Sequence, residues 1–318
     1  MITNRKILIT GGSGFIGTTI ASRLIDENEI IILDTFDRDL ISNSGIFNHK
    51  NLKVIRGDVR SIADVELAMK NIDLVVHAAG IAGIQTVGVD PVKTLEVNII
   101  GSANVLRAAS NHQVERVICF STSEVYGPNA VGVSEESNAV IGSAGEARWT
   151  YAVSKLAEEH LALAYSRHGK PKLNTVVLRP FNVYGPGQIG EGAIKNFIER
   201  ALRNETLTVH GDGSQIRAWC YVMDMVDATL IACENEAALG ESFNIGNPRS
   251  VISVYGLANT IIRVLNSNSK IEFAPHPSKD IQVRIPTTEK ASEILGFTAQ
   301  IDLEVGLART AEYFEKNN

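Results

Sequence analysis

Short, nearly uninterrupted apolar runs rich in β-branched residues recur along the first 180 residues, and helical patterns separate them. A strand that is apolar at every position is covered on both faces, and a helix between successive strands provides the crossover that a parallel sheet requires. This alternation predicts an α/β fold with a doubly wound parallel sheet. The predicted strands lie at 6–10, 30–34, 52–58, 73–79, 116–122 and 175–180.

Helix start and stop signals support the same interpretation. Asp90 and Pro91 supply an N-cap and a first-turn proline, and Gly169 is placed to end a long helix. Each signal lies at the edge of a segment with helical periodicity. The predicted helices lie at 15–27, 61–70, 90–111 and 150–169.

After about residue 180 the alternation gives way to loops that contain Gly and Pro. We therefore expect a Rossmann-type main domain over residues 1–180 and a smaller, ligand-covering region over 181–318. A helical pattern at 223–236 and a strand pattern at 241–246 indicate that the segment 219–246 returns to the main sheet. The two regions are therefore expected to interleave.

Composition restricts the class of ligand. Apolar residues make up 44% of the chain and charged residues 21%, which is typical of a folded globular protein. The formal charge of −6 argues against a nucleic-acid partner. An anionic ligand must therefore meet locally placed cations or backbone amides.

Cysteine and histidine usage gives no sign of a metal site, and we predict none. Cys119, Cys220 and Cys233 lack the spacing of metal ligands and lie in or beside apolar runs, so we expect reduced, buried thiols. No apolar run is long enough to span a bilayer. We therefore expect a cytoplasmic protein with no membrane partner.

A glycine-rich turn joins the first predicted strand to the first helix. Gly11, Gly14 and Gly17 in the segment TGGSGFIG would let the backbone approach a pyrophosphate at a helix N-terminus. Asp34 ends the second strand, where a carboxylate accepts hydrogen bonds from a ribose 2′-hydroxyl and repels a 2′-phosphate. The pair predicts NAD as the cofactor. Arg38 keeps NADP open as an alternative, and is otherwise a surface charge.

Tyr151 and Lys155 in the segment YAVSK stand four residues apart on a predicted helix, and so share one face. A lysine ammonium beside a phenol lowers the pKa of the tyrosine and makes it a base for a sugar hydroxyl. Ser121 and Thr122, at the end of a predicted strand, are natural neighbours of this pair. Asp58, after the third strand, contacts the adenine edge or caps the next helix.

Taken with these residues, the chain resembles the extended short-chain dehydrogenase/reductase family, specifically the NAD-dependent nucleotide-sugar epimerases, dehydratases and decarboxylases. The resemblance runs nearly end to end. Its motifs are TGGSGFIG, VVHAAG, STSEVYG, YAVSK, LRPFNVYGPG, GDGSQIRAWCYV and a C-terminal LGF followed by GLARTAEYF.

The resemblance implies a role for each motif. Tyr151 is the base that starts hydride transfer from carbon 4 of the sugar to NAD, Lys155 also binds the nicotinamide ribose, and Thr122 orients the 4-hydroxyl. Asn182 contacts the sugar or its phosphate. The implied diphosphate contacts are Lys195, Arg217 and Arg284. The implied cofactor contacts are Gly11, Gly14, Phe15, Ile16, Gly17, Asp34, Asp58, Val59, Ala78, Ala79, Asn98, Ser121, Tyr151 and Lys155.

The triplet Thr122-Ser123-Glu124 bears on the reaction that follows oxidation. Family 4,6-dehydratases have an aspartate at the position of Ser123, and serine is a poor general acid. Simple 4-epimerases need no carboxylate at the position of Glu124. UDP-glucuronate decarboxylases carry T-S-E, and Arg148 and Trp149 further resemble the bacterial members. Decarboxylation of UDP-glucuronate, with Ser123 and Glu124 among the catalytic residues, is therefore our leading hypothesis.

Several alternatives stay open. Dehydration, or 4-epimerisation or 4-dehydrogenation, would start from the same 4-keto sugar, and a non-catalytic dinucleotide sensor is a more distant alternative. Glu124 could merely cap a turn, and Arg217 could be a phosphate anchor or a proton donor. Trp219 is expected in the core, and Glu146 in a solvated loop. The resemblance also implies a homodimer formed through the helices near 91–112 and 151–168, in an enzyme of carbohydrate biosynthesis.

Overall fold

The computed structural model describes residues 2–275 and 281–317. Seven parallel strands form the main sheet, in the order β12-β7-β5-β4-β1-β2-β3. The order reverses at β1, between β2 and β4, which is the switch point of a Rossmann-type sheet. The strands are β1 (Lys6–Thr10), β2 (Glu29–Asp34), β3 (Leu52–Arg56), β4 (Leu74–His77), β5 (Arg116–Phe120), β7 (Thr175–Pro180) and β12 (Ser242–Ile245). The predicted fold class is confirmed.

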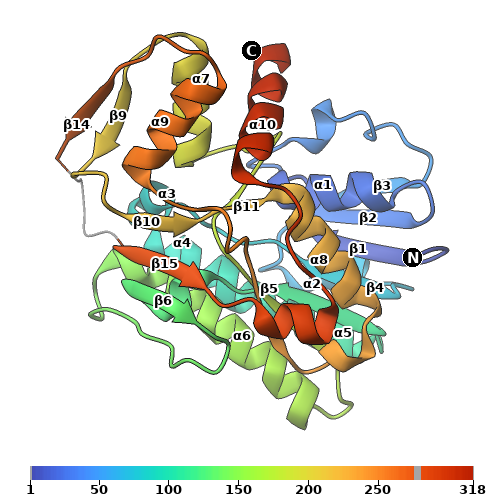
Figure 1. Ribbon diagram of the computed structural model, residues 1–318. Coiled ribbons are helices and arrows are strands. Elements are labelled where there is room, and N and C mark those ends of the chain that lie inside the picture. Colours follow the sequence, from blue (N-terminus) through green and yellow to red (C-terminus); the bar gives the residue numbers. More distant parts are fainter. Residues whose placement is uncertain (1, 276–280, 318) are drawn as a thin grey trace.

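Helices cover both faces of this sheet (Figure 1). Helices α1 (Phe15–Leu24) and α8 (Val222–Glu234) pack on one face. Helices α2 (Ile62–Ala68), α5 (Ser102–Asn111) and α6 (Thr150–His168) pack on the other. Because the central strands are buried on both sides, their sequences are apolar without alternation.

The predicted helix at 90–111 is a continuous helical segment with a change of hydrogen bonding in its middle. It begins as α4 (Pro91–Leu95), passes through a π-helical turn at Glu96–Gly101, and continues as α5. The Asp90 carboxylate accepts a hydrogen bond from the backbone N–H of Lys93 at 2.8 Å, so this residue is the N-cap as predicted. Gly169 follows the last residue of α6, which confirms that boundary. A further short helix, α3 (Ile84–Val89), was not predicted.

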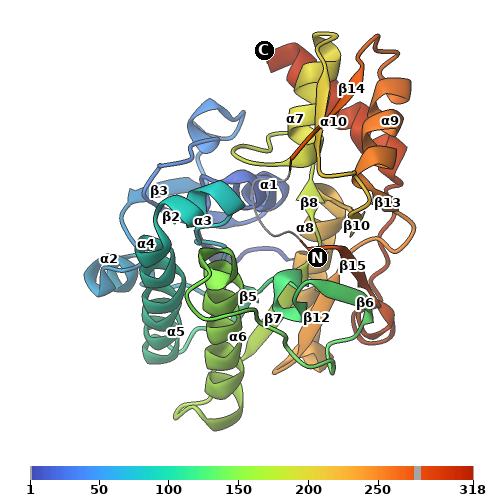
Figure 2. The ribbon, with the colours of Figure 1, turned by 90° about the vertical axis from the view of Figure 1, so that its left-hand side faces the viewer.

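The smaller region is built mainly from the last third of the chain. Helices α7 (Ala193–Leu202), α9 (Val254–Val264) and α10 (Leu303–Asn317) pack together around an apolar core (Figure 2). A two-stranded parallel sheet of β9 (Leu207–His210) and β14 (Ile271–Ala274) joins them. Trp219 is buried in this core, as predicted.

Strands exchange between the two regions. Strand β12 pairs with β7 in the main sheet. In the opposite direction, β6 (Asn129–Val133) pairs with β15 (Val283–Pro286) in a four-stranded sheet with β10 (Ile216–Ala218) and β13 (Val251–Ser253). Strands β8 (Val183–Tyr184) and β11 (Cys220–Tyr221) form a further pair. The chain therefore crosses repeatedly between the regions, and the crossings surround one site.

The three cysteines are free and buried, as predicted. Across residues 2–275 and 281–317, no helix combines the length and the apolarity needed to cross a bilayer. The same residues contain no cluster of three or more His, Cys, Asp or Glu side chains that could hold a metal ion.

A buried ion pair ties β7 to α6. The guanidinium of Arg179 donates to Glu159 at 2.6 Å, and the Ser242 hydroxyl on β12 donates to the same carboxylate oxygen at 2.6 Å. Replacing Arg179 by Met leaves this carboxylate buried without its cation, so we expect the free energy of unfolding to fall by about 3–5 kcal/mol. Urea unfolding followed by circular dichroism measures it.

The matched control is Arg203→Met. Arg203 pairs with Glu205 at 2.8 Å, but both side chains are exposed, and exposed pairs contribute little. This variant should unfold like the parent. Equal stability of the two variants would show that the buried pair does not join the helix to the sheet.

Candidate active site

A cleft of about 1210 Å³ opens at the carboxyl ends of the main strands, where the loops after β1, β2, β3, β4 and β5 meet. The glycine turn forms its floor. Gly11 has φ +70°, and a Cβ atom there would lie 2.5 Å from the backbone nitrogen of Ala79. At Gly17 a Cβ atom would lie 2.5 Å from the carbonyl oxygen of Gly11. Both positions need glycine, because the turn packs directly against its own helix and the end of β4.

Asp34 stands at the end of β2 and lines this cleft. Its carboxylate accepts hydrogen bonds from the backbone N–H of Ser13 at 3.0 Å and of Phe36 at 2.8 Å. These bonds fix the carboxylate beside the glycine turn, where the ribose of a dinucleotide is expected.

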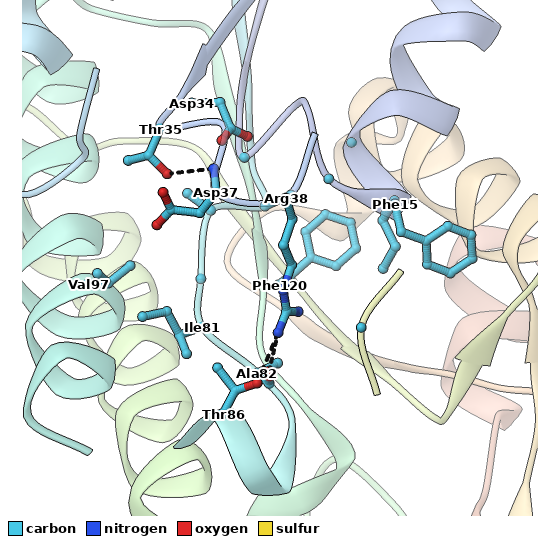
Figure 3. Close-up of a pocket in the computed structure, with 18 of the residues that line it drawn as sticks. Phe15, Asp34, Thr35, Asp37, Arg38, Ile81, Ala82, Thr86, Val97 and Phe120 are labelled. Carbon is cyan, nitrogen blue, oxygen red and sulfur yellow. Dashed lines mark hydrogen bonds between the residues drawn. The ribbon is translucent and has the colours of Figure 1, made fainter. Parts of the chain in front are cut away.

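Arg38 extends away from Asp34 toward the start of α3 (Figure 3). Its guanidinium donates to the hydroxyl of Thr86 at 3.1 Å and to the carbonyl of Ala82 at 3.4 Å. Arg38 is exposed, as the surface-charge alternative expected, but it is hydrogen-bonded to the start of α3. Its direction gives no support to a 2′-phosphate site beside Asp34.

The predicted cofactor residues come together with one exception. Those that line the cleft are Gly11, Gly14, Phe15, Ile16, Gly17, Asp34, Asp58, Val59, Ala78, Ala79, Ser121, Tyr151 and Lys155. Asn98 is fully buried and is not among the described lining residues. Its side chain bonds both the N–H of Ile81, at 2.8 Å, and the carbonyl of Ile81, at 3.1 Å. Asn98 therefore supports the cleft wall from behind.

Asp58 does not cap the following helix, so that alternative is wrong. Ser61 is the N-cap of α2, and its hydroxyl accepts a hydrogen bond from the N–H of Asp64 at 3.3 Å. The Asp58 carboxylate instead binds the guanidinium of Arg60 at 2.7 Å, and this hydrogen bond holds the pKa of Asp58 below its usual value. The interpretation as an adenine contact stays a prediction.

Tyr151 and Lys155 lie in the first turns of α6 and face the cleft. Loss of hydration raises the pKa of Tyr151, and the charge of Glu124 raises it further, whereas a hydrogen bond from Thr122 lowers it. The expectation that Lys155 lowers this pKa is wrong for the ligand-free protein. The physical reason is that burial, followed by the charge of Glu124, holds the pKa above its usual value, and that the ammonium of Lys155 forms an ion pair with Glu158.

Glu124 lies between two arginines. The guanidinium of Arg148 donates to it at 2.6 Å, and Arg284 on β15 lies 3.5 Å from its other oxygen. Burial raises the pKa of Glu124, but the charges of Arg284 and Arg148 outweigh it and hold the pKa below its ordinary value. The carboxylate is therefore ionised at neutral pH.

The alternative that Glu124 merely caps a turn is wrong. Thr122 is the N-cap of the 3₁₀ turn Ser123–Tyr126, and its hydroxyl accepts the hydrogen bond from the N–H of Glu124 at 3.2 Å. Ser123 is 1% exposed within that turn. The carboxylate of Glu124 therefore interacts with the two arginines and does not cap the turn.

Arg217 and Arg284 occupy paired positions on neighbouring strands β10 and β15, and both are buried. Arg217 donates to the carbonyl of Ile216 at 3.0 Å. Asn182 is held beside this sheet by a hydrogen bond to the carbonyl of Ala218 at 2.8 Å. Lys195 is different, because it pairs with Glu199 on its own helix at 2.9 Å. The structure does not bring Lys195 to the Glu124 cluster.

Sequence reasoning missed two functional candidates in this area, and it misplaced a third carboxylate that has a structural contact. Glu158 stands three residues after Lys155, a spacing that could have identified it as a partner of the lysine. Glu191 accepts hydrogen bonds from the N–H groups of Gln85 at 2.9 Å and Thr86 at 2.8 Å across the cleft, and no local signal predicts such a contact. Glu146, expected in solvent, accepts a hydrogen bond from the indole of Trp149 at 3.2 Å.

Comparison with known proteins places this geometry in a family. Residues 7–246 match the NAD dependent epimerase/dehydratase family. The chain is 34% identical to UDP-N-acetyl-alpha-D-glucosaminuronate decarboxylase of Bacillus cytotoxicus, with 98% of each chain covered. It is also 34% identical to UDP-glucuronic acid decarboxylase 5 of Arabidopsis thaliana, covering 98% of this chain and 90% of that one.

A solved structure supports the same placement. The UDP-glucuronic acid 4-epimerase from Bacillus cereus, in complex with UDP-glucuronic acid and NAD, superimposes with a TM-score of 0.89 at 28% identity. The match covers 98% of this chain and all of the other. The chain therefore belongs to the NAD dependent epimerase/dehydratase family, and it is an NAD-dependent enzyme of the extended short-chain dehydrogenase/reductase type.

Proposed function

We propose that the protein decarboxylates a UDP-hexuronate after oxidising carbon 4 of the sugar. The observation that carries this proposal is the position of Glu124 between Arg148 and Arg284. Two guanidinium groups meet one carboxylate in a place where the three side chains are 6–15% exposed. Poorly hydrated guanidinium groups favour anionic partners, so this charge cluster is suited to an anionic group of the substrate.

The place of this charge favours the sugar carboxylate over the diphosphate as its partner. Thr122 hydrogen-bonds to the phenol of Tyr151 and is separated from Glu124 by a single residue. The cluster therefore lies on the side of the phenol, where the sugar reacts. A carboxylate bound by Arg148 there would belong to carbon 6 of a hexuronate.

The chemistry is consistent with the residues present. NAD, held by the glycine turn and Asp34, supplies the hydride acceptor, and Tyr151 takes the proton of the 4-hydroxyl. The resulting 4-keto uronate is a β-keto acid, in which the bond from carbon 5 to the carboxylate breaks without an acid for a leaving hydroxyl. Dehydratases of the family carry an aspartate at the position of Ser123. Decarboxylation needs no acid there, so a serine is compatible with it. Both relatives named above are decarboxylases of UDP-hexuronates.

A direct assay separates the candidate reactions. The protein is incubated with UDP-glucuronate, with UDP-N-acetylglucosaminuronate and with UDP-glucose, and the products are analysed by mass spectrometry. We expect carbon dioxide and a pentose nucleotide from at least one uronate. A product of unchanged mass would instead indicate a 4-epimerase, and loss of water from the neutral sugar would indicate a dehydratase. Unchanged uronates would rule out the proposal.

Arg148 provides a test of carboxylate recognition. The Nε atom of Arg148 is a buried donor without a partner among the described residues, so the side chain has capacity for a further acceptor. Arg148→Gln removes a charge-assisted hydrogen bond, so we expect KM for the uronate to rise about 10- to 100-fold. The dissociation constant of UDP-glucose should stay within a factor of about two. Equal weakening of both ligands would place the arginine elsewhere in the nucleotide site.

We also propose that the protein acts as a homodimer in the cytoplasm. Exposed apolar side chains on the helices predicted to form the dimer support this: Val92, Ile100 and Val153 are 64%, 48% and 41% exposed. A second copy would cover them. Analytical ultracentrifugation should give a dimer that Val92→Glu converts to monomer. A monomeric parent would remove the proposal.

A further inference from the structure

A buried carboxylate lies against the predicted catalytic lysine. Glu158 stands one turn after Lys155 on α6 and is 1% exposed, and Lys155 is 4% exposed. The ammonium and the carboxylate form an ion pair. The roles that family resemblance implies for Tyr151 and Lys155 leave this carboxylate unexplained.

A chain of polar groups extends from Glu158 under the floor of the cleft. Ser102 on α5 faces the carboxylate and lowers its pKa. Its hydroxyl donates to the carbonyl of Asn98 at 2.5 Å and lies 2.9 Å from Nε2 of His77 on β4. Nδ1 of His77 lies 2.7 Å from the hydroxyl of Thr10 on β1. Burial, followed by the charge of Lys155, lowers the pKa of His77 to about 3, so the imidazole is neutral at working pH. Lys155 is therefore the cation of this network, and Glu158 balances it.

The ion pair matters for Tyr151, which precedes Lys155 by one turn on the same helix face. A lysine ammonium favours a phenolate only to the extent that no nearby anion cancels its charge. We propose that Glu158 is a positioning residue that holds the Lys155 ammonium and opposes ionisation of the Tyr151 phenol. The base then forms when the ammonium leaves this carboxylate. This inference rests on the Tyr–Lys pair of the family and not on which nucleotide sugar reacts.

Other charged groups also face Tyr151 and Glu158, and a test of the proposal must account for their effects on the two pKa values. Tyr151 faces Glu124, which raises its pKa, and Arg284 on β15, which lowers it. Burial raises the pKa of Glu158 above its usual value, and the charge of Glu159 raises it further, whereas Lys155 lowers it. The thiol of Cys119 on β5 also faces Glu158 but is neutral, because burial raises its pKa well above the usual value. Changing Glu158 alone therefore removes one negative charge and leaves the others in place.

The first test uses Glu158→Gln, which keeps the shape of the side chain and removes its charge. In the ligand-free protein, the ultraviolet absorbance of tyrosinate is titrated with alkali, and the titration of the corresponding Tyr151→Phe double variant is subtracted. We expect the ionisation constant of Tyr151 to rise at least about tenfold relative to the parent. This readout needs neither cofactor nor sugar, so it stays informative if decarboxylation is not the reaction.

The second readout is the pH dependence of 4-oxidation in the holoenzyme, followed by the absorbance of the reduced nicotinamide. The acid limb of the profile reports the base that must lose its proton. We expect this limb to move to lower pH in Glu158→Gln, by about one unit. A purely structural role would lower the rate at every pH and leave the limb in place, and that result would overturn the inference.

Glu159→Gln is the matched control. This carboxylate is the next residue on α6 and is 2% exposed, but it binds Arg179 and Ser242 on the side of the sheet. The variant loses the same formal charge, so we expect lower stability with an unmoved acid limb. Equal movement in both variants would show that contact with Lys155 is not the cause, and so would contradict the proposal.

Ser102→Ala keeps the inference testable if Glu158→Gln does not fold. The hydroxyl of Ser102 lowers the pKa of Glu158, so its loss favours the neutral carboxyl. The acid limb should then move in the same direction by a smaller amount. An unmoved limb, or one displaced to higher pH, would count against the proposal.

Discussion

Replacing Tyr151 by Phe should slow 4-oxidation by about a hundred- to ten-thousandfold and leave NAD bound, because the phenol is the proposed general base and a benzene ring cannot take a proton. Thr122 hydrogen-bonds to this phenol, and the ring lines the cleft beside Lys155. The ring itself remains in the variant, so the packing of α6 should be unchanged. Single-turnover formation of reduced nicotinamide measures the first step, and fluorescence titration measures the affinity for NAD.

Tyr165→Phe is the matched control for this prediction. Tyr165 stands on the same helix but packs against the apolar layer below the sheet and does not face the cleft. Its loss of a hydroxyl should leave 4-oxidation unchanged. Full turnover in Tyr151→Phe would mean that another group is the base. The Tyr–Lys spacing would then have no role in the reaction.

The pH dependence of the parent enzyme follows from the same geometry. Because the pKa of Tyr151 is raised in the ligand-free structure, the phenol is protonated at neutral pH, and its active form increases as the pH rises. The rate of 4-oxidation should therefore rise with pH on the acid side of its profile. Tyr151→Phe should lose this dependence together with the rate.

The main sheet was predictable because its signal is local. Each central strand contains an apolar run of three or more residues, and the strand at 6–10 and the strand at 175–180 were predicted to the residue. Strands β6 and β15 lack this signal, because both are short and partly exposed and they pair with each other across a large sequence separation. These two strands were not predicted for that reason.

The active site also has a part that local sequence signals predict and a part that they do not. Tyr151 and Lys155 share a helix face by their spacing alone, and the glycine turn and Asp34 are fixed by the ends of two predicted strands. The charge cluster depends instead on tertiary contacts: Arg284 reaches Glu124 only because β15 lies beside β6. Sequence reasoning named Arg284 as a diphosphate contact, which stays a prediction, and no local signal indicated that it would also lie beside Glu124. The sequence also predicted that the charge of Lys155 would lower the pKa of Tyr151. It did not indicate that Lys155 would instead form an ion pair with Glu158.

Glu124→Gln should separate oxidation from the later protonation of carbon 5. The glutamine can still bond to Arg148 and Arg284, so the pocket should keep its shape. It cannot ionise, however, and so cannot relay a proton to carbon 5 of the enolate that loss of carbon dioxide leaves. Glu124 also raises the pKa of Tyr151, so its neutralisation makes the phenol easier to ionise and should spare 4-oxidation to within about tenfold.

The protonation that follows loss of carbon dioxide should slow by about a hundred- to ten-thousandfold, the usual contribution of a positioned acid or base. A first turnover should still reduce the nicotinamide and release carbon dioxide, but formation of the pentose nucleotide should be slow. Labelled uronate measures the burst of carbon dioxide and the slow appearance of the pentose nucleotide. Glu146→Gln makes the same chemical change at a carboxylate that bonds the indole of Trp149 at 3.2 Å, and it should form the pentose nucleotide at the parental rate.

The ion pairs also predict how acid affects the pocket. The pKa of Glu124 is lower in the folded protein than in the unfolded chain, so its pairs with Arg148 and Arg284 stabilise the fold above the unfolded pKa. This contribution is lost as the pH falls through the folded pKa. Glu124→Gln should therefore be less stable than the parent at neutral pH, and the difference should shrink in acid. If Glu124→Gln completes the whole reaction at the parental rate, or fails already at 4-oxidation, this carboxylate does not divide the two steps, and the reaction class must be argued from the arginines alone.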